Sequence, residues 1–207
     1  MRSLKTIAII GATGKMGRAI SKKLTAGNYR LLLMANDKDK LNALRKELIH
    51  AVRDVNVAQS TCAIEAAWEA DIILMATPYD AEKEVAEKIK QVATGKIVIS
   101  ISNPLEGDFN DLITPNDTSA GEELQKLLPY SKVVKTFNTT VPADFESPAA
   151  SGQLVDAFVA GNSRDAVNTV SAIVKTAGFN PIVAGDLAMS MTLERNAVNA
   201  YSDRNQQ

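Results

Sequence analysis

The fold of this chain is decided by one stretch near its start, Ile9-Ile10-Gly11-Ala12-Thr13-Gly14-Lys15-Met16-Gly17. It joins an apolar run typical of a buried strand to the first turn of an amphipathic helix pattern. In such a place Gly11 permits a tight turn, Gly14 lets backbone N–H groups approach a pyrophosphate, and Gly17 lets the helix pack closely on the strand. The helix N-terminus adds further N–H donors and the positive end of its dipole.

The spacing is GxxGxxG rather than the more common GxGxxG. The alternative is a turn whose glycines serve only the backbone geometry. Because the glycines stand at the first strand–helix junction, we predict a dinucleotide phosphate site formed by Gly11, Ala12, Thr13, Gly14, Lys15 and Met16.

Short runs rich in Ile and Val alternate with amphipathic stretches along the rest of the chain, a pattern typical of a parallel sheet buried on both faces. We expect strands at residues 6–10, 30–34, 55–58, 71–76, 96–100, 132–137, 154–160 and 181–184. We expect helices at residues 15–26, 38–50, 80–92, 121–128, 164–177 and 188–201, and a loop over 103–118. The order predicts an α/β protein with a three-layer Rossmann NAD(P)-binding fold, a mostly parallel doubly wound sheet and a short C-terminal extension. Residues 1–207 are expected to form a single dinucleotide-binding domain.

The end of the second expected strand should meet the adenosine ribose, and it carries Asn36, Asp37 and Lys38. An acidic residue there can accept a hydrogen bond from the ribose 2′-hydroxyl and disfavours a 2′-phosphate, whereas a lysine favours the phosphate. Asp37 could equally be the N-cap of the following helix. The residues alone therefore leave NAD and NADP open.

A third candidate segment follows the strand expected at residues 71–76. Ala76, Thr77 and Pro78 form a small-residue loop stiffened by proline. In a doubly wound sheet the carboxyl ends of the strands border the ligand crevice. We therefore expect the backbone of Ala76, Thr77 and Pro78 to flank the cofactor.

The composition excludes several other classes of function. The 207 residues carry 23 Lys+Arg and 24 Asp+Glu, so the net charge of -1 favours neither nucleic acid nor a membrane surface as a partner. One cysteine, Cys62, forms no internal disulfide and is expected to be a buried thiol, and the one histidine, His50, is expected at the surface. No metal site is predicted. No segment resembles a signal sequence or a membrane span, so we expect a cytoplasmic protein.

Four motifs together resemble the deazaflavin-dependent NADP oxidoreductase family, which includes the cytosolic reductase domains of membrane ferric and cupric reductases. They are Gly11-Ala12-Thr13-Gly14-Lys15-Met16-Gly17, Ala70-Asp71-Ile72-Ile73-Leu74-Met75-Ala76-Thr77-Pro78, Lys135-Thr136-Phe137-Asn138-Thr139, and Ala184-Gly185-Asp186-Leu187 with Leu193-Glu194. The first two motifs are shared with other Rossmann reductases, including pyrroline-5-carboxylate reductase. The last two are more particular to the family. Family members commonly have Ser-Arg or Asn-Arg after the second strand, whereas this chain has Asn36-Asp37.

The resemblance implies an NAD(P)-dependent oxidoreductase that transfers hydride between nicotinamide and a flavin, a deazaflavin or another small acceptor. It implies NADP as cofactor, with NAD left open by Asp37, and it places Asn138 and Thr139 on the acceptor side near the reacting ring. A hydrogen-bonded strand end without a ligand is the alternative for these two residues. The two cofactor rings supply the chemistry, so no catalytic side chain is predicted.

Two other functions remain open from the sequence: a non-catalytic NAD(P)-binding redox sensor, and a small hydroxy- or imino-acid dehydrogenase. The apolar residues of the last expected helix suggest a homodimer, although core packing explains them nearly as well.

Overall fold

A computed structural model describes residues 4–105, 112–115, 117–146 and 154–205, with residues 199–205 described by their backbone alone. Eight strands form one sheet in the order β3-β2-β1-β4-β5-β6-β7-β8. The strands are β1 (Lys5–Ile10), β2 (Tyr29–Met34), β3 (Asn56–Ser60), β4 (Ile72–Met75), β5 (Ile97–Ser100), β6 (Lys132–Thr136), β7 (Asp156–Gly161) and β8 (Asn180–Gly185). All neighbouring strands pair in parallel except β6 and β7, which pair antiparallel.

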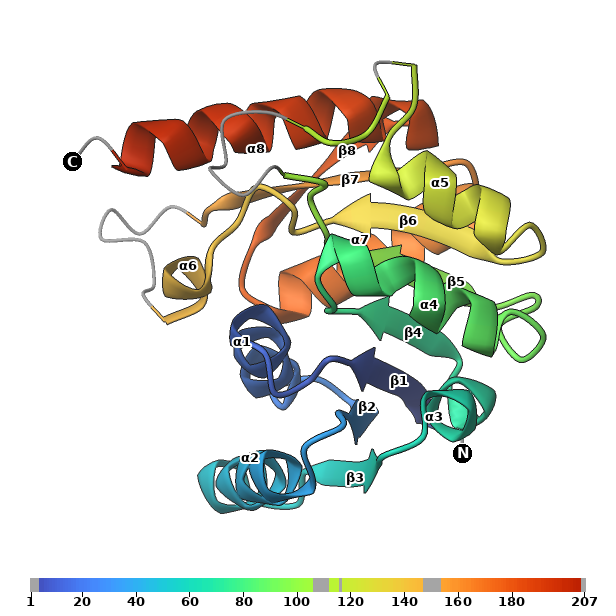
Figure 1. Ribbon diagram of the computed structural model, residues 1–207. Helices are drawn as coiled ribbons and strands as arrows, with labels where there is room; N and C mark the ends of the chain where they lie inside the picture. The colour runs from blue at the N-terminus through green and yellow to red at the C-terminus, as the bar shows by residue number, and fades with distance from the viewer. Residues whose placement is uncertain (1–3, 106–111, 116, 147–153, 206–207) are drawn as a thin grey trace.

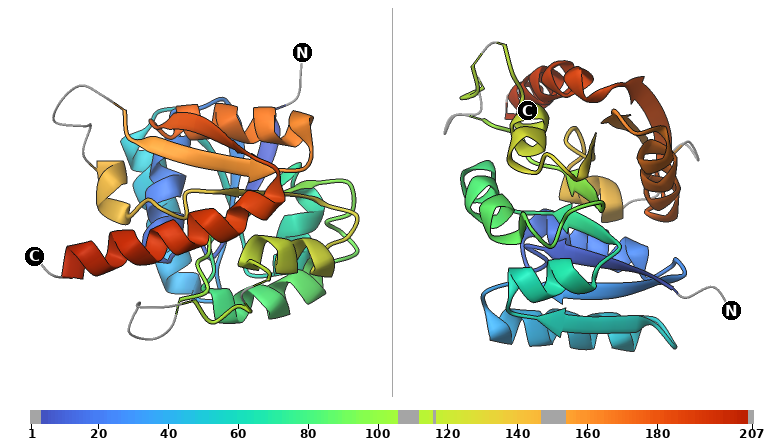
Figure 2. Two further views of the ribbon diagram at one scale, coloured as in Figure 1. Left: turned by 90° about the horizontal axis from the view of Figure 1, so that it is seen from above. Right: turned by 90° about the vertical axis from the view of Figure 1, so that its right-hand side faces the viewer.

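Helices cover both faces of this sheet (Figures 1 and 2). They are α1 (Lys15–Leu24), α2 (Lys38–Ala51), α3 (Ala63–Glu69), α4 (Tyr79–Ile89), α5 (Ala120–Leu127), α6 (Pro142–Glu146), α7 (Arg164–Thr176), the short 3₁₀ helix η1 (Leu187–Met189) and α8 (Ser190–Asn205). Helices α1, α2 and α7 pack on one face, and α3, α4 and α5 pack on the other.

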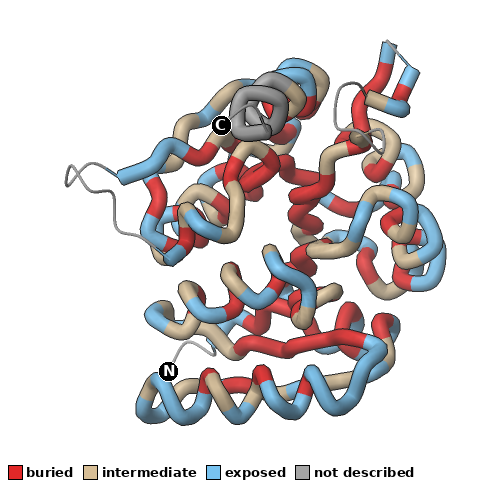
Figure 3. Tube along the Cα trace, turned by 60° about the vertical axis from the view of Figure 1, so that its left-hand side comes forward, coloured by how far each residue is buried: buried red, intermediate tan, exposed pale blue. Residues whose placement is uncertain are grey.

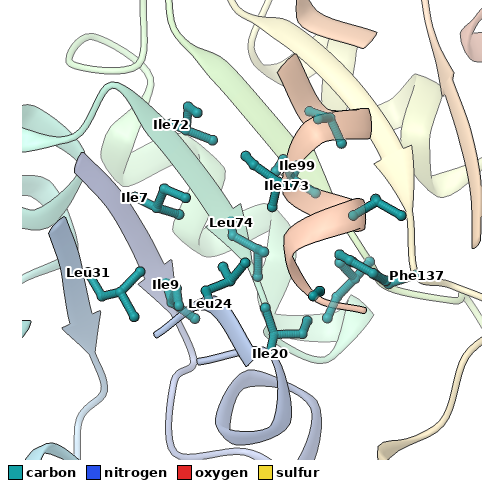
Figure 4. Close-up of a cluster of buried hydrophobic side chains, with 14 of the residues drawn as sticks. Ile7, Ile9, Ile20, Leu24, Leu31, Ile72, Leu74, Ile99, Phe137 and Ile173 are labelled. Atoms are coloured by element: carbon teal, nitrogen blue, oxygen red, sulfur yellow. The ribbon is translucent and has the colours of Figure 1, made fainter. Parts of the chain in front are cut away.

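Side chains of each central strand alternate between two apolar clusters. In β1, Ile7 and Ile9 join the cluster with α1, α2 and α7, whereas Ala8 and Ile10 join the cluster with α3, α4 and α5. Figure 4 shows part of the first cluster, in which Phe137 lies beyond β6. Buried positions therefore follow the strands and the inner faces of the helices (Figure 3), as burial of the sheet on both faces requires.

The reversal at β7 sets the course of the C-terminal helix. Because β7 and β8 run opposite to the six preceding strands, β8 ends at the edge of the sheet where those strands begin. Helix α8 then returns across the molecule towards the carboxyl ends of β1, β4 and β6, and its distal end extends past the body on the side of α6 (Figures 1 and 2). This course brings the start of α8 beside β6 and α5.

The predicted fold class is confirmed, including the doubly wound sheet and the C-terminal extension. Two helices, α3 and α6, were not predicted. Helix α3 buries only Ala63, Ala66 and Ala67, so its sequence lacks a periodic pattern of large apolar residues. The expected buried thiol is wrong, because Cys62 is partly exposed where it precedes α3. His50 is at the surface, as expected, and part of the expected loop, residues 106–111 and 116, lies outside the described residues.

Candidate functional site

Two of the three glycines in the first turn are required by packing. Gly11 has a positive φ of 87°, and a Cβ there would lie 2.4 Å from the carbonyl oxygen of Ala76. A Cβ on Gly17 would lie 2.3 Å from the carbonyl oxygen of Gly11, which confirms the close packing of α1 on the strand. These two residues therefore need to be glycine whether or not a ligand binds.

Gly14 differs from its neighbours in this respect. Its φ is -67°, it is exposed, and the atom nearest to an added Cβ is the Gly11 carbonyl oxygen at 3.3 Å. That contact is tighter than most, and the backbone carbonyl of Gly11 would have to shift by a few tenths of an ångström to admit a side chain. The backbone conformation does not require a glycine here, and the exposed position leaves the helix N-terminus open.

The N-terminus of α1 presents free N–H groups. Within the described part of the chain no side chain caps it, and its first turn contains no acidic residue. Helices α2, α5 and α7 are instead capped by the side chains of Asp37, Ser119 and Ser163. The first N–H groups of a helix have no partner within the helix. Together with the exposed ammonium of Lys15, those of α1 can therefore bind the oxygens of a phosphate.

Asp37 is the N-cap of α2, as one of the two interpretations predicted. Its carboxylate accepts hydrogen bonds from the backbone N–H groups of Asp39, at 3.1 Å, and Lys40, at 3.0 Å. The Lys40 ammonium lies 3.2 Å from the other carboxylate oxygen. Hydrogen bonds from Lys40 are the main cause that lowers the pKa of Asp37, so this carboxyl group is ionised at neutral pH. Asn36 and Lys38 beside it are exposed.

The three predicted segments meet at the carboxyl edge of the sheet. The N–H groups of Gly11 and Ala12 both donate to the carbonyl of Met34, at the end of β2. The N–H of Ala76 donates to the carbonyl of Ile10, so the loop after β4 lies against the glycine turn. In that loop the hydroxyl of Thr77 has no hydrogen-bond partner among the described residues. A donor or acceptor left without a partner beside a crevice is a polar position that a ligand can satisfy.

Asn138 and Thr139 lie at the end of β6, on the same edge. Asn138 is buried, and its side-chain amide donates to the Leu193 carbonyl at 2.9 Å and to the side-chain carbonyl of Asn103 at 3.1 Å. Asn103 returns a hydrogen bond of 2.6 Å to the backbone carbonyl of Asn138. The Asn138 side chain therefore fixes the strand end within the protein, and the partly exposed Thr139 is the more accessible of the two.

Three ionisable side chains are buried beneath this edge. Lys135 Nζ lies 2.7 Å from Glu194 Oε1, and neither side chain is exposed. The same ammonium donates to the Ser102 carbonyl, and the Ser102 hydroxyl donates to Glu82 at 2.7 Å. Burial raises the pKa of Glu82, against the opposing effects of Lys135 and of hydrogen bonds from Ser102 and Ser100.

Glu82 and Ser102 were not among the predicted site residues, and Lys135 and Glu194 were predicted only as parts of motifs. One signal was available for Lys135, which is a charged residue inside the apolar run Val133-Val134-Lys135-Thr136-Phe137. Charged residues are rarely buried without a partner, so a lysine in a buried strand indicates an acidic partner elsewhere in the chain.

Two of the cavities among the described residues lie near α1 and near α4 at this edge of the sheet. One, of about 210 Å³, lies between α1 and α6 and is lined by Lys15, Arg18 and Phe145 among others. The other, of about 170 Å³, lies between α4 and α5, where the Tyr79 hydroxyl donates to Glu123. Partial burial and this hydrogen bond raise the pKa of Tyr79, so Tyr79 remains a neutral donor at neutral pH. Within the described residues no group of three or more His, Cys, Asp or Glu side chains could hold a metal ion.

Comparison with known proteins agrees with this geometry. Residues 6–104 match the family described as NADP oxidoreductase, coenzyme F420-dependent. The F420-dependent NADP reductase of Methanocaldococcus jannaschii is 29% identical over 199 residues, which cover 91% of this chain and 87% of that protein. Metalloreductase STEAP3 of Rattus norvegicus is 24% identical, over 91% of this chain and 35% of that protein.

Among solved structures, that of a candidate F420-dependent NADP reductase from Arthrobacter sp. FB24 has a TM-score of 0.78 and 24% identity, covering 97% of this chain and 93% of the other. This likeness concerns the fold. The family match covers the glycine turn and the loop after β4, and the relative from Methanocaldococcus jannaschii extends the similarity to nine-tenths of the chain. This chain is therefore similar to the deazaflavin-dependent NADP oxidoreductases, the family that its motifs resemble.

Proposed function

We propose that this protein is an oxidoreductase that transfers a hydride between the nicotinamide of NADP and a deazaflavin of the coenzyme F420 type. The observation that carries the proposal is the uncapped N-terminus of α1 behind the exposed Gly14, where the backbone conformation does not require a glycine. The names of the full-length relatives, F420-dependent NADP reductases, support the choice of both substrates.

In this proposal the pyrophosphate of NADP lies on the turn formed by Gly11, Ala12, Thr13, Gly14, Lys15 and Met16. Asn36, Asp37 and Lys38 face the adenosine ribose, and Ala76, Thr77 and Pro78 flank the path towards the nicotinamide. Thr139 and the backbone of Asn138 border the space for the second ring. The unpartnered hydroxyl of Thr77 and the free helix N-terminus fit such a ligand.

When bound, the two rings would supply the redox chemistry, the transfer of one hydride with its two electrons from the reduced nicotinamide to the deazaflavin, with one further proton taken up from solvent. The protein's part is to hold the two rings in contact and to exclude water. For this reason no side chain of the chain is assigned as a general acid or base.

NADP is favoured over NAD because Asp37 is engaged by α2 and by Lys40. Its two backbone hydrogen bonds and the nearby ammonium offset its charge, and Lys38, one residue along, is exposed and free to meet a 2′-phosphate. Repulsion between two unit charges at about 4 Å amounts to about 1–4 kcal/mol, depending on the effective dielectric constant, and one lysine can balance it.

A dehydrogenase of small hydroxy or imino acids is the alternative enzyme. The names of the full-length relatives, F420-dependent NADP reductases, favour the deazaflavin reductase over it. A non-catalytic sensor would bind NADP without turnover.

We also propose a cytoplasmic homodimer made of single-domain chains. The partly exposed Met189 and Met191 and the exposed Val183 on edge strand β8 support the dimer. Within the described residues no helix is long and apolar enough to cross a membrane.

The proposal is tested by following NADPH and NADH oxidation at 340 nm with coenzyme F420, FMN and ferric citrate as separate acceptors. We expect oxidation of NADPH with F420 at a rate well above that with the other two acceptors. NADP binding measured by calorimetry without turnover on any acceptor would favour the sensor, and turnover only with hydroxy or imino acids would favour the dehydrogenase. Light scattering coupled to size exclusion would test the homodimer.

A further inference from the structure

The buried ammonium of Lys135 lies at the centre of the hydrogen bonds that shape the acceptor side of the crevice. It lies 2.7 Å from Glu194 on α8 and donates to the backbone carbonyl of Ser102 after β5. It therefore joins two segments that are more than 90 residues apart in the sequence. Lys135 itself is on β6, between those two segments, and is fully buried.

The residues that hold Asn138 are the immediate neighbours of these two partners. Asn103 follows Ser102, and Leu193 precedes Glu194. The Asn138 amide donates to both Asn103 and Leu193. Two backbone carbonyls, those of Leu193 and Asn138, can only accept hydrogen bonds, so they fix which way both asparagine amides point. Lys135 thus positions both of the groups that orient Asn138.

Glu194 extends the same network to a helix N-terminus. Its carboxylate accepts from the N–H groups of Ala120 at 3.0 Å and Gly121 at 3.3 Å, at the start of α5. Helices α5 and α8 approach closely here, because a Cβ on Gly121 would lie 2.6 Å from the hydroxyl oxygen of Ser190. One carboxylate therefore satisfies two N–H groups of α5 and the charge of Lys135.

A buried ion pair contributes little net stability to a protein core, because burying both charges costs desolvation free energy. Replacing such a pair by apolar side chains of similar volume is often neutral or stabilising, whereas removing one partner is strongly destabilising. The pair is thus poorly explained by stability alone. Its location, directly beneath the end of β6 that bears Asn138 and Thr139, points to a role in geometry.

We propose that Lys135, through Glu194 and Ser102, is a positioning residue for the acceptor side of the crevice. It holds the end of β5, the end of β6 and the start of α8 in one arrangement, and Thr139 is aligned by it towards the second ring. The expected change in the KM for F420 rests on the proposed function. The expected change in the protein's own structure is independent of any substrate.

The test uses Lys135→Met, Glu194→Met and the double variant Lys135→Met/Glu194→Met. The single variants each leave one buried charge without its partner, so their melting temperatures should fall. The double variant removes both charges and should recover most of that fall. Lys88→Met is the matched control, because Lys88 forms an exposed ion pair with Glu84 on α4 that touches none of this network.

The decisive comparison is between the double variant and wild type. We expect the KM for F420 to rise at least tenfold in the double variant, while the dissociation constant of NADP measured by calorimetry changes less than twofold. Lys88→Met should leave both unchanged. A double variant that recovers both its melting temperature and the wild-type KM would show that the pair is needed neither for stability nor for positioning and would overturn the proposal.

A readout without substrate separates this inference from the proposed function. In amide hydrogen exchange, Ala120 and Gly121 should lose protection because their acceptor Glu194 is removed. Beyond these two residues, the double variant should lose protection selectively at residues 101–103, 138–140 and 190–194 and keep it at residues 11–17. Uniform loss, or no loss at these three segments, would refute positioning by Lys135 even in an active enzyme. Selective loss in a protein that does not turn over F420 would uphold the positioning and refute the proposed function instead.

Discussion

Replacement of Gly14 by alanine is the sharpest test of the phosphate site, because the structure separates the effect on folding from the effect on binding. The backbone at Gly14 suits alanine, with φ -67° and ψ 164°, and the added Cβ would lie 3.3 Å from the Gly11 carbonyl oxygen. Alanine is a poorer N-cap than glycine, by about 0.5–1 kcal/mol. It also restricts the unfolded chain, which stabilises by about 0.4–1 kcal/mol. The free energy of unfolding should therefore change by less than about 1 kcal/mol.

Binding should respond much more strongly. The new methyl group lies where a phosphate has to approach the first N–H groups of α1, and each hydrogen bond to a charged group contributes about 1.5–3 kcal/mol. Loss of one such bond corresponds to a weakening of NADP binding by a factor of roughly 10–150, since about 1.4 kcal/mol is tenfold. Thermal or urea unfolding gives the stability, and calorimetric titration with NADP gives the dissociation constant.

Gly95→Ala provides the control. Gly95 precedes β5 and, unlike Gly14, has a positive φ of 78°, and a Cβ there would meet nothing within 4 Å. Alanine should cost about 1 kcal/mol of stability through backbone strain and leave NADP binding unchanged. If Gly14→Ala binds NADP as well as wild type does, the phosphates do not lie on this turn. If it unfolds several kcal/mol more easily, the glycine is there for the fold.

Three further predictions concern single side chains. Asp37→Ser keeps an N-cap oxygen while removing a negative charge, so NADP binding should strengthen severalfold relative to NAD binding. Calorimetry with both nucleotides measures the ratio of the two dissociation constants. An unchanged ratio would place the 2′-phosphate elsewhere. Because burial raises the pKa of Glu82 in the folded protein, its contribution to stability is present below its ordinary value of 4.5 and is lost as the pH rises above it. The melting temperature of Glu82→Gln should thus fall less than that of wild type as the pH is raised from 4 to 8, and parallel profiles would contradict this. Phe179 packs against Phe137 and Phe145, with ring centroids 5.6 Å and 4.6 Å away, so Phe179→Ala leaves a cavity in this cluster. The free energy of unfolding measured in urea should fall by about 3–5 kcal/mol. A fall below about 1 kcal/mol would mean that the neighbouring side chains fill the cavity.

The sequence predicts the sheet well because its strands are continuous apolar runs with clear glycine or polar limits. All eight expected strands are present, each with limits within two residues of those expected. The glycine turn is equally readable, since glycines at a strand–helix junction indicate a tight turn and close packing of the helix, which Gly11 and Gly17 show. Helices α3 and α6 were not predicted because they are only seven and five residues long, which is too short for a periodic pattern of apolar residues.

The buried polar network could not be predicted from the sequence, for a different reason. Lys135, Glu194, Ser102 and Glu82 come from four separate segments, and only the folded topology brings them together. Local sequence also gave two equal interpretations for Asp37, and the two backbone hydrogen bonds at the start of α2 establish one of them. Patterns within a segment thus predict the elements and the turn, whereas contacts between distant segments have to be observed.

The antiparallel step between β6 and β7 has a practical consequence for work with this protein. Because it sends α8 back across the sheet, the two visible ends of the chain lie on opposite sides of the molecule, with Leu4 beside the start of β1 and the end of α8 on the side of α6 (Figure 1). A fluorophore or affinity tag joined ahead of Leu4 should leave ligand access undisturbed. One joined after α8 would lie on the side of the carboxyl ends of β1, β4 and β6, where the ligands are proposed to enter, and would serve there as a distance reporter (Figure 1).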